Sequence, residues 1–373
     1  MFKSLLFLLL LLPFTAISQF TITGKIINSS DKTPVASASV FLNNAVVGTK
    51  TNDDGTFTLT GVRLGQYDLV VSIVGYETSH QNVMVNADVK LPAIEIVSKM
   101  ILLKEVRIKS KDDWAKNYET FKRYFFGESE YAGQCKILNK NLPDILDLDY
   151  DRQTKTFTAK SSDYLEIENK ALGYKIRYML SDFNRDDKTG DFYYEGTTLF
   201  EELKGSKSQI RKWKKNRLDA YEGSSMRFLR STISNTLEDE GFKALRLIRK
   251  PNPAYDGFNA KFLQTLVSTP LTINDFVKLT NEPGTFALSF TDCLYIIYNK
   301  KKAHRQDKSI SSSKSSPEFL DDPLTTTLIF NGPYSLYDNN GIIINPRSLV
   351  FDGNWGNRLV AELLPVDYVP ETK

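Results

Sequence analysis

The chain has 373 residues, of which 41% are hydrophobic and 25% are charged, a composition typical of globular proteins with room for about two or three domains. Its formal net charge of +3 is close to neutral for this length and gives no electrostatic case for a nucleic-acid partner. The two cysteines, Cys135 and Cys293, could pair in an oxidising compartment or remain as two separate buried thiols.

The first 18 residues have the three parts of a secretory signal peptide. Lys3 is followed by an apolar run over residues 5–12 and by the small-residue site Ala16-Ile17-Ser18. The run is too short to span a bilayer, although an uncleaved N-terminal anchor helix is the alternative. We therefore expect a mature protein that begins at Gln19 and is exported, either periplasmic or associated with the outer membrane. No cysteine lies near the cleavage site to carry a lipid anchor, and no later stretch has the apolar length of a transmembrane helix.

Alternation of apolar and polar residues predicts a series of short strands after the signal peptide. Phe57 and Leu59 alternate with threonines in one strand, and the preceding Asp54-Gly55 favours a tight hairpin. The pattern breaks over residues 61–66 and resumes in a second strand, which ends at Gly75-Tyr76. Further strands are expected at residues 22–26, 38–42, 83–85, 91–97 and 102–108. About seven short strands at this spacing predict a small β-sandwich.

Three segments of this region carry a family resemblance: GKIINSSDKTPVASASVFL, GTKTNDDGTFTLTGVRLGQYDLVVSIVGYE and LLKEVRI. Together they resemble the carboxypeptidase-like regulatory domain, over residues 20–110. The resemblance implies a transthyretin-like β-sandwich, a module that follows the catalytic domain in some zinc carboxypeptidases and begins many TonB-dependent outer-membrane receptors. It implies a fold and a cell compartment, and it brings no catalytic residues with it.

A charged junction at residues 109–113 is the predicted domain boundary, and a helix is expected to follow it. Asp112 or Asp113 can cap the start of this helix and Gly127 its end. Its aromatic residues recur on one face, which we expect to pack against a sheet, although such a stripe could also line a ligand groove. These residues are Trp114, Tyr118, Phe121 and Phe125.

The next region returns to a period of two, which predicts an antiparallel meander with turns at residues 151–153 and 184–190. Asp147, Asp149 and Asp151 have the spacing of calcium-loop ligands, but the mid-loop glycine is missing and Thr158 stands where a bidentate glutamate belongs. We expect these carboxylates on the solvent face of a strand, and we expect Asp182, Asn184 and Asp186 in a hairpin turn. The predicted strands are residues 135–138, 145–150, 155–159, 164–167, 174–183 and 192–200.

A strongly basic helical stretch follows within residues 206–237. The cations from Lys204 to Arg217, with Trp213 among them, could contact lipid headgroups, lipopolysaccharide phosphates or acidic glycans. The alternative is a solvated helix face that nearby carboxylates partly neutralise. After a break at Gly223, a second helix turns one apolar face to the core. The cations are Lys204, Lys207, Arg211, Lys212, Lys214, Lys215 and Arg217, and the apolar face consists of Met226, Leu229, Ile233 and Leu237.

The runs ALGYKIRYMLSDF and FEELKGSKSQIRKWKKNRLDAYEGSSMRFLRS resemble the uncharacterised region that follows the regulatory-like module in other envelope proteins, and this resemblance brings no known activity. The last third of the chain again has β character. A long polar loop is expected over residues 299–323, a turn over 338–341 and a short helix over 355–364. Strands are expected at residues 244–248, 286–290, 294–298 and 324–330.

Familiar catalytic motifs are missing from the sequence. The only histidines, His80 and His304, do not begin the H-x-x-E motif of a carboxypeptidase-type zinc site. There is no G-x-S-x-G, no phosphate-binding G-x-x-x-x-G-K-[ST] and no C-x-x-C. A serine triad that uses either histidine, or a carboxylate pair of the glycosidase type, stays open because both are defined in space. We predict no catalytic, cofactor-binding or metal-binding residues and no cofactor.

The sequence thus predicts a mainly β protein in three parts: a signal peptide at residues 1–18, a seven-strand β-sandwich at 19–110, and an α+β domain with an antiparallel sheet at 111–373. The expected function is that of an exported, non-catalytic cell-envelope protein whose sandwich binds another protein or a surface polymer such as a glycan, with no nucleic-acid partner and no transmembrane segment. One alternative is a hydrolase acting on peptide or glycan, with its site in residues 111–373, and another is a purely structural role with the sandwich as a spacer.

Overall fold

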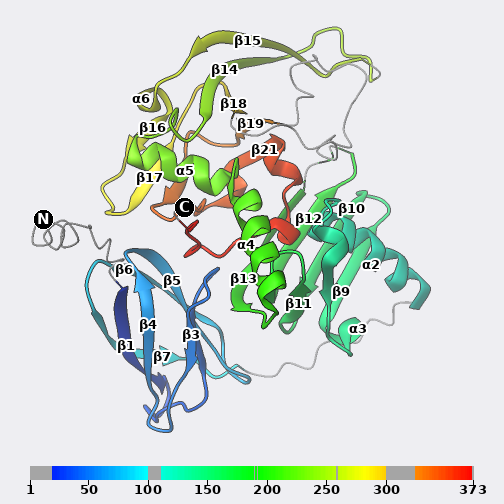
Figure 1. Ribbon diagram of the computed structural model, residues 1–373. Helices are drawn as coiled ribbons and strands as arrows, with labels where there is room; N and C mark the ends of the chain where they lie inside the picture. The colour runs from blue at the N-terminus through cyan, green and yellow to red at the C-terminus, as the bar shows by residue number, and fades with distance from the viewer. Residues whose placement is uncertain are drawn as a thin grey trace, which may run out of the picture. The chain divides into compact units, whose positions relative to one another are not determined.

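The computed structural model describes residues 19–99 and 111–371, except Thr189, Asp191, Phe258 and residues 300–323, and gives only the backbone of Lys111 and Asp112. Contacts divide this part of the chain into a first unit, residues 19–40 and 49–99, and a second unit, residues 41–48 and 111–371 (Figure 1). The predicted signal peptide, the strand at 102–108, most of the charged junction and the polar loop with His304 lie outside the described residues.

The predicted mainly β fold is confirmed, and its N-terminal part consists of seven strands in two sheets. One sheet has the order β4-β1-β7 and the other β3-β2-β5-β6. β1 pairs with β4 antiparallel and with β7 parallel. The strands are β1 Gln19–Asn28, β2 Ser39–Leu42, β3 Gly48–Lys50, β4 Thr56–Arg63, β5 Gly65–Ser72, β6 Ser79–Val85 and β7 Val89–Ile96.

The hairpin predicted at Asp54-Gly55 is not formed, because β4 pairs with β1 in one sheet while β3 and β5 belong to the other. Two glycines nevertheless shape the chain around β4. Gly55 has φ +78°, and a Cβ there would lie 2.5 Å from the carbonyl oxygen of Ile26, so the predicted turn before β4 requires glycine. Gly61 was expected to begin the break after the strand. Instead it has φ +76° beside a register shift in the β1–β4 pairing, and β4 continues to Arg63. The irregularity is a bulge within the strand rather than its end.

The second unit begins with helix α2, Lys111–Phe126, and a six-stranded sheet. All six predicted strands are present, and all their pairings are antiparallel. The order is not that of a meander, because the long β12 pairs with β10 and β11 as well as with β13. The strands are β8 Cys135–Ile137, β9 Leu146–Asp151, β10 Thr156–Ser161, β11 Leu165–Asn169, β12 Tyr174–Asp186 and β13 Phe192–Glu202, with short helices η2 Ala132–Gln134 and α3 Leu142–Ile145 beside them.

The aromatic stripe of α2 packs against this sheet, as predicted. Phe121 and Phe125 are fully buried, and their rings lie 4.7 Å apart. Phe121 contacts Phe183 of β12 edge-on at 5.6 Å. Gly127 ends the helix with φ +87°, and its N–H donates to Arg123 O at 3.0 Å. The stripe therefore forms core rather than a ligand groove.

A bulge in β12 changes which side chains face the core. Leu180 is buried before the register shift and Phe183 after it, so the buried positions move from even to odd numbers. Asp182, Asn184 and Asp186 belong to the strand itself, and the prediction of a hairpin turn at these three residues is wrong. The extra residue of the bulge is not visible in a simple alternation pattern.

Two helices follow, α4 Lys207–Tyr221 and α5 Ser225–Ser234, separated at Gly223 as predicted. Ser206 caps α4: its hydroxyl accepts from Gln209 N at 3.3 Å, and its own N–H donates to the Gln209 side chain at 2.8 Å. Gly223 has φ +71°, and a Cβ there would lie 2.7 Å from the ring of Tyr298.

Two further antiparallel sheets complete the unit, with the orders β15-β14-β18-β19-β21 and β16-β17-β20. The four predicted strands are present. The helix expected over residues 355–364 is instead two short 3-10 turns, η5 Trp355–Asn357 and η6 Val360–Glu362. None of the helices in the described ranges is long and apolar enough to cross a bilayer. The other elements are β14 Phe242–Pro251, β15 Phe262–Pro270, α6 Ile273–Phe276, β16 Val277–Leu279, β17 Thr285–Leu288, β18 Cys293–Tyr298, β19 Thr325–Phe330, β20 Ser335–Asp338, η4 Pro346–Ser348 and β21 Leu349–Gly353.

Candidate functional site

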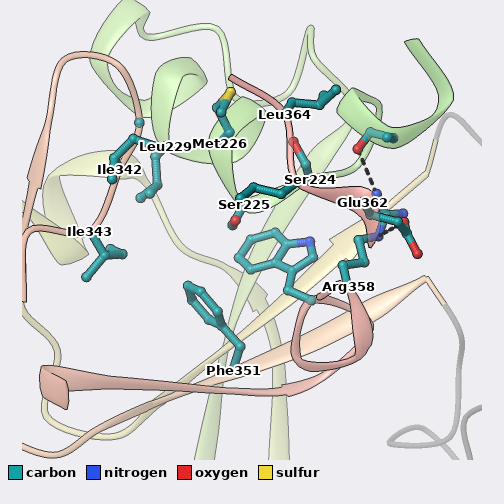
Figure 2. Close-up of a pocket in the computed structure, with 14 residues that line it drawn as sticks. Ser224, Ser225, Met226, Leu229, Ile342, Ile343, Phe351, Arg358, Glu362 and Leu364 are labelled. Carbon is teal, nitrogen blue, oxygen red and sulfur yellow. Dashed lines mark hydrogen bonds and ion pairs between the residues drawn. The ribbon is translucent and has the colours of Figure 1, made fainter. Parts of the chain in front are cut away.

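A recess of about 210 Å³ lies in the second unit, between the start of α5 and the C-terminal segment. In Figure 2, Phe351 lies opposite Ser225 and Met226, and Arg358 and Glu362 lie together at one end. Most of the lining side chains are apolar, as is usual for small ligand sites. The lining residues are Ala220, Ser224, Ser225, Met226, Leu229, Gly341, Ile342, Ile343, Phe351, Trp355, Arg358, Glu362, Leu363 and Leu364.

One wall of the recess is a tight turn that docks against α5. The Asp338 carboxylate closes this turn by accepting from Asn340 N at 3.0 Å and from Ile342 N at 2.9 Å. Gly341 has φ +79°, and a Cβ there would lie 2.6 Å from Met226 O. Arg230 of α5 fastens the same turn by donating to Asn340 O at 2.8 Å. Burial raises the pKa of Asp338 to about 6, against the two hydrogen bonds, which lower it.

The floor of the recess is aromatic. The indole N–H of Trp355 donates to Gly223 O at 2.7 Å, so its one polar atom is satisfied away from solvent. The Trp355 ring packs against two phenylalanine rings: the distance between ring centroids is 5.2 Å for Phe228 and 5.4 Å for Phe351. These contacts leave an apolar surface that suits the binding of an apolar group.

The polar end of the recess has a structural role. Arg358 donates to Ala220 O at 3.0 Å and lies 3.8 Å from the Glu362 carboxylate. Its guanidinium therefore caps the last carbonyls of α4. Two-carboxylate glycoside hydrolysis needs a second carboxyl across the scissile bond, and among the described lining residues only Glu362 supplies one.

The acidic residues that the sequence singled out do not converge. Asp147, Asp149 and Asp151 lie on the exposed face of β9, as expected. Asp151 accepts from Thr154 N at 3.1 Å and Gln153 N at 2.7 Å, and these hydrogen bonds hold the pKa of its carboxyl below the usual value. No group of three or more potential metal-ligating side chains occurs among the residues described.

His80, Cys135 and Cys293 are the candidate base and nucleophiles in the described part of the chain. His80 lies on β6, an edge strand of the sandwich, with its Nδ1 2.8 Å from Asp68. Cys135 and Cys293 are both free thiols. Burial raises the pKa of Cys135 to about 12 and also raises that of Cys293, so both thiols are protonated near neutral pH and are poor nucleophiles.

The basic stretch from Lys204 to Arg217 divides into two sets of side chains. Trp213 and Arg217 are buried, whereas Lys207, Arg211 and their neighbours are exposed. Sequence reasoning placed all of them on one surface. The signal that could have separated them is the spacing of four between Trp213 and Arg217, which puts both on one side of a helix.

An exposed apolar turn on the sandwich was not singled out by the sequence. Val74 is 98% exposed, and Val97, on the segment that pairs with this turn, is 51% exposed. The two segments are held together by hydrogen bonds from Glu77 N to Val97 O and from Lys99 N to Gly75 O, each of 2.8 Å. The Val74 and Val97 side chains are thus exposed on two segments that the bridge between Tyr76 and Ser98 joins.

Comparison with solved structures gives only weak likenesses. A type II cohesin-X-dockerin complex from Acetivibrio cellulolyticus is 25% identical over 21% of this chain and 56% of the other, with a TM-score of 0.19. The group B streptococcus pilus 2b backbone protein is 25% identical over 21% and 41% (TM-score 0.18), and a DUF3823 family protein from Bacteroides ovatus is 12% identical over 50% and 83% (TM-score 0.18). The chain thus spans little more than half of the first of these, and TM-scores this low do not establish a shared fold.

No curated protein matches the chain. A family model does match part of it, at residues 22–108, which include six of the seven sandwich strands in full and most of β1. This is the same family that the three segments in the sequence resemble. We conclude that residues 22–108 form a CarboxypepD_reg-like domain.

Proposed function

We propose that this protein is an exported, non-catalytic component of the cell envelope, periplasmic or associated with the outer membrane, whose N-terminal β-sandwich binds another protein or a surface polymer. The observation that carries the proposal is the CarboxypepD_reg-like domain at residues 22–108. The sequence resemblance implies that such a module brings no catalytic residues with it. The division into a signal peptide at 1–18, a sandwich at 19–110 and an α+β domain at 111–373 is part of the same proposal.

The exposed side chains of Val74 and Val97, on two hydrogen-bonded segments of the sandwich, support a protein partner over a glycan. Burial of apolar surface is the main driving force of protein association, and a valine held almost fully in water gains most from being covered. The backbone pairing between residues 75–77 and 97–99 fixes both valines before any partner arrives. Less ordering entropy is then lost on binding.

A photo-crosslinking amino acid placed at Val74 of the full chain, expressed in its native envelope, tests this contact. We expect a discrete crosslinked species at this position. The matched control carries the same amino acid at Leu64, which is 62% exposed in the sandwich and lies between β4 and β5. Equal crosslinking from both positions, or none from Val74, would contradict a binding surface at the Val74–Val97 pair.

A hydrolase with its site in residues 111–373 is the alternative, and the recess is the place where it would act. Glu362 is the lining carboxylate available for such chemistry, and it is ion-paired with Arg358. Purified full chain is incubated with envelope peptides and glycans, and the products are followed by mass spectrometry beside the Glu362→Gln variant. Product release that is lost in the variant would establish the hydrolase instead.

A further inference from the structure

Helix α4 is fixed to the turn before β12 by three side chains. The indole N–H of Trp213 donates to Lys170 O at 2.9 Å, and the Asn216 amide donates to Ala171 O at 2.8 Å. Arg217 donates to the next two carbonyls, of Leu172 at 2.7 Å and Gly173 at 3.1 Å. Four consecutive carbonyls are thus satisfied by one side of the helix, which fixes its rotation about its own axis.

Close packing strengthens this attachment. A Cβ at Gly173 would lie 2.2 Å from the Trp213 ring, and a Cβ at Gly205 would lie 2.5 Å from the opposite part of the same ring. Trp213 is therefore wedged between two glycines, and only glycine allows this approach. The side chains on the outer side of α4 consequently project from a rigid support.

That outer side carries five exposed cations, and Lys204 lies just before the helix; we call these six residues the α4 basic face. All six side chains are exposed. Lys214 forms an ion pair with Glu371 at 2.5 Å, but both partners are more than half exposed, where such pairs contribute little. The other five have no ion pair within the described part of the chain. The members are Lys204, Lys207, Arg211, Lys212, Lys214 and Lys215.

This arrangement is unfavourable for the isolated protein. Lys207, Arg211 and Lys215 follow one another at intervals of four residues, the spacing at which like charges on a helix destabilise it. Lys207 also stands in the first turn, where the helix dipole disfavours a cation. A bound polyanion would reduce both the repulsion between these cations and the unfavourable interaction of Lys207 with the helix dipole. The charge pattern therefore favours binding of an anionic partner.

Among the described residues, the α4 basic face has no broad apolar surface beside its cations, and this limits the chemistry of the partner. The apolar side of α4 is buried in the protein, and Ile210, which is 40% exposed, is the one large hydrophobic side chain that this helix presents to solvent. A helix that inserts into a bilayer needs a broad apolar face. Five of the six cations are lysines, which attract anions as point charges without the planar fork of arginine. We propose that the α4 basic face binds a linear acidic polysaccharide by charge attraction.

The test measures binding of the full mature chain, residues 19–373, to polygalacturonate at low and high salt. The variant Lys207→Gln/Arg211→Gln/Lys215→Gln should bind at least about tenfold more weakly and should show a smaller salt dependence. The control variant Lys136→Gln/Lys140→Gln/Lys160→Gln removes three exposed cations elsewhere in the second unit and should bind like the unchanged protein. Both variants change exposed residues only, and thermal melting checks that they fold.

Three outcomes would overturn the proposal. Equal weakening in both variants would show that only total charge matters. Undiminished binding by the first variant would place the site elsewhere. Binding to phosphatidylglycerol vesicles but not to polygalacturonate would replace the polysaccharide by a membrane surface. The proposal does not depend on the sandwich: crosslinking at Val74 should be the same in both variants, so failure of one proposal leaves the other to be judged separately.

Discussion

Arg217 differs from the exposed cations around it in the sequence because its guanidinium is buried. It donates to Leu172 O and Gly173 O, pairs with Glu202 at 2.5 Å, and lies 3.9 Å from the centre of the Tyr174 ring. A buried charge is tolerated when its donors are satisfied in this way. The same side chain joins α4 to the turn that precedes β12.

Replacing Arg217 should therefore lower the free energy of unfolding. Arg217→Ala removes the side-chain donors of Leu172 O and Gly173 O, of which Gly173 O keeps the Leu203 N–H, and it leaves the Glu202 carboxylate without its partner. We expect a loss of about 3 kcal/mol in the free energy of unfolding, measured in urea. Arg211→Ala, at an exposed position of the same helix, is the control and should change stability by less than about 0.5 kcal/mol. Similar losses in the two variants would mean that Arg217 does not hold α4 in place.

The buried carboxyl of Asp338 makes a second prediction, which concerns pH. Its pKa is raised by burial from 3.8 to about 6. Between these values the folded state holds a proton that the unfolded state has released, so stability falls as pH rises through this range. The contribution is fully present below pH 3.8 and is lost above about pH 6. The expected fall is on the order of 2–3 kcal/mol, since each pH unit corresponds to about 1.4 kcal/mol.

Asp338→Asn keeps an oxygen that can accept from Asn340 N and Ile342 N and removes the titration. Thermal melting from pH 4 to pH 7 should show a flatter pH profile than in the unchanged protein, with a higher melting temperature near pH 7. Asp352→Asn, at an exposed position, is the control and should leave the slope as it is. An unchanged slope in Asp338→Asn would show that another group causes the pH dependence.

Single residues were the hardest feature to predict from the sequence. Arg217 stands in a run of cations and has no local mark except its spacing from Trp213. Asp338 was expected only as part of a turn, because burial of its carboxyl depends on α5 and on the segment that follows β20. Such roles arise from contacts between distant parts of the chain, to which periodicity is not sensitive.

Among the elements, α2 shows most directly how a sequence pattern becomes a core. Phe125 contacts Phe121 at 4.7 Å and Tyr178 at 5.1 Å, whereas Tyr118 stacks on Trp114 at 5.0 Å nearer the surface. Phe125→Ala should lower the free energy of unfolding by about 3–5 kcal/mol, because it removes a large buried ring and leaves a cavity. Tyr118→Ala, on the same face, should cost clearly less. Equal losses would mean that the stripe is uniformly buried.

Strands with regular alternation were predicted, and strands without it were missed. β4, β5 and β12 were found because apolar residues recur at every second position. β15 was missed because Phe262–Pro270 lies at a sheet edge with little of its surface buried, so no alternation is required there. β16 has three residues, too few to show a period. The pairing of β12 with three strands could not be deduced, because sheet order is set by non-local contacts.

At the scale of the whole molecule, export is the first part of the account to test. The sequence predicts cleavage after Ser18, so the mature protein should begin at Gln19. N-terminal mass analysis of protein recovered from the envelope fraction should find Gln19, with or without cyclisation. Recovery of the chain with Met1 intact from that fraction would contradict the prediction of a signal peptide.

The central claim is that the protein binds an envelope component through its sandwich and does not cleave that component. The most direct measurement is co-sedimentation of the purified chain, residues 19–373, with envelope fragments, combined with mass spectrometry of the soluble fraction. We predict saturable sedimentation that Val74→Lys/Val97→Lys abolishes and Leu64→Lys does not, with no new soluble fragments over time. Continued release of peptide or glycan fragments, or sedimentation that is indifferent to the two valines, would contradict the account.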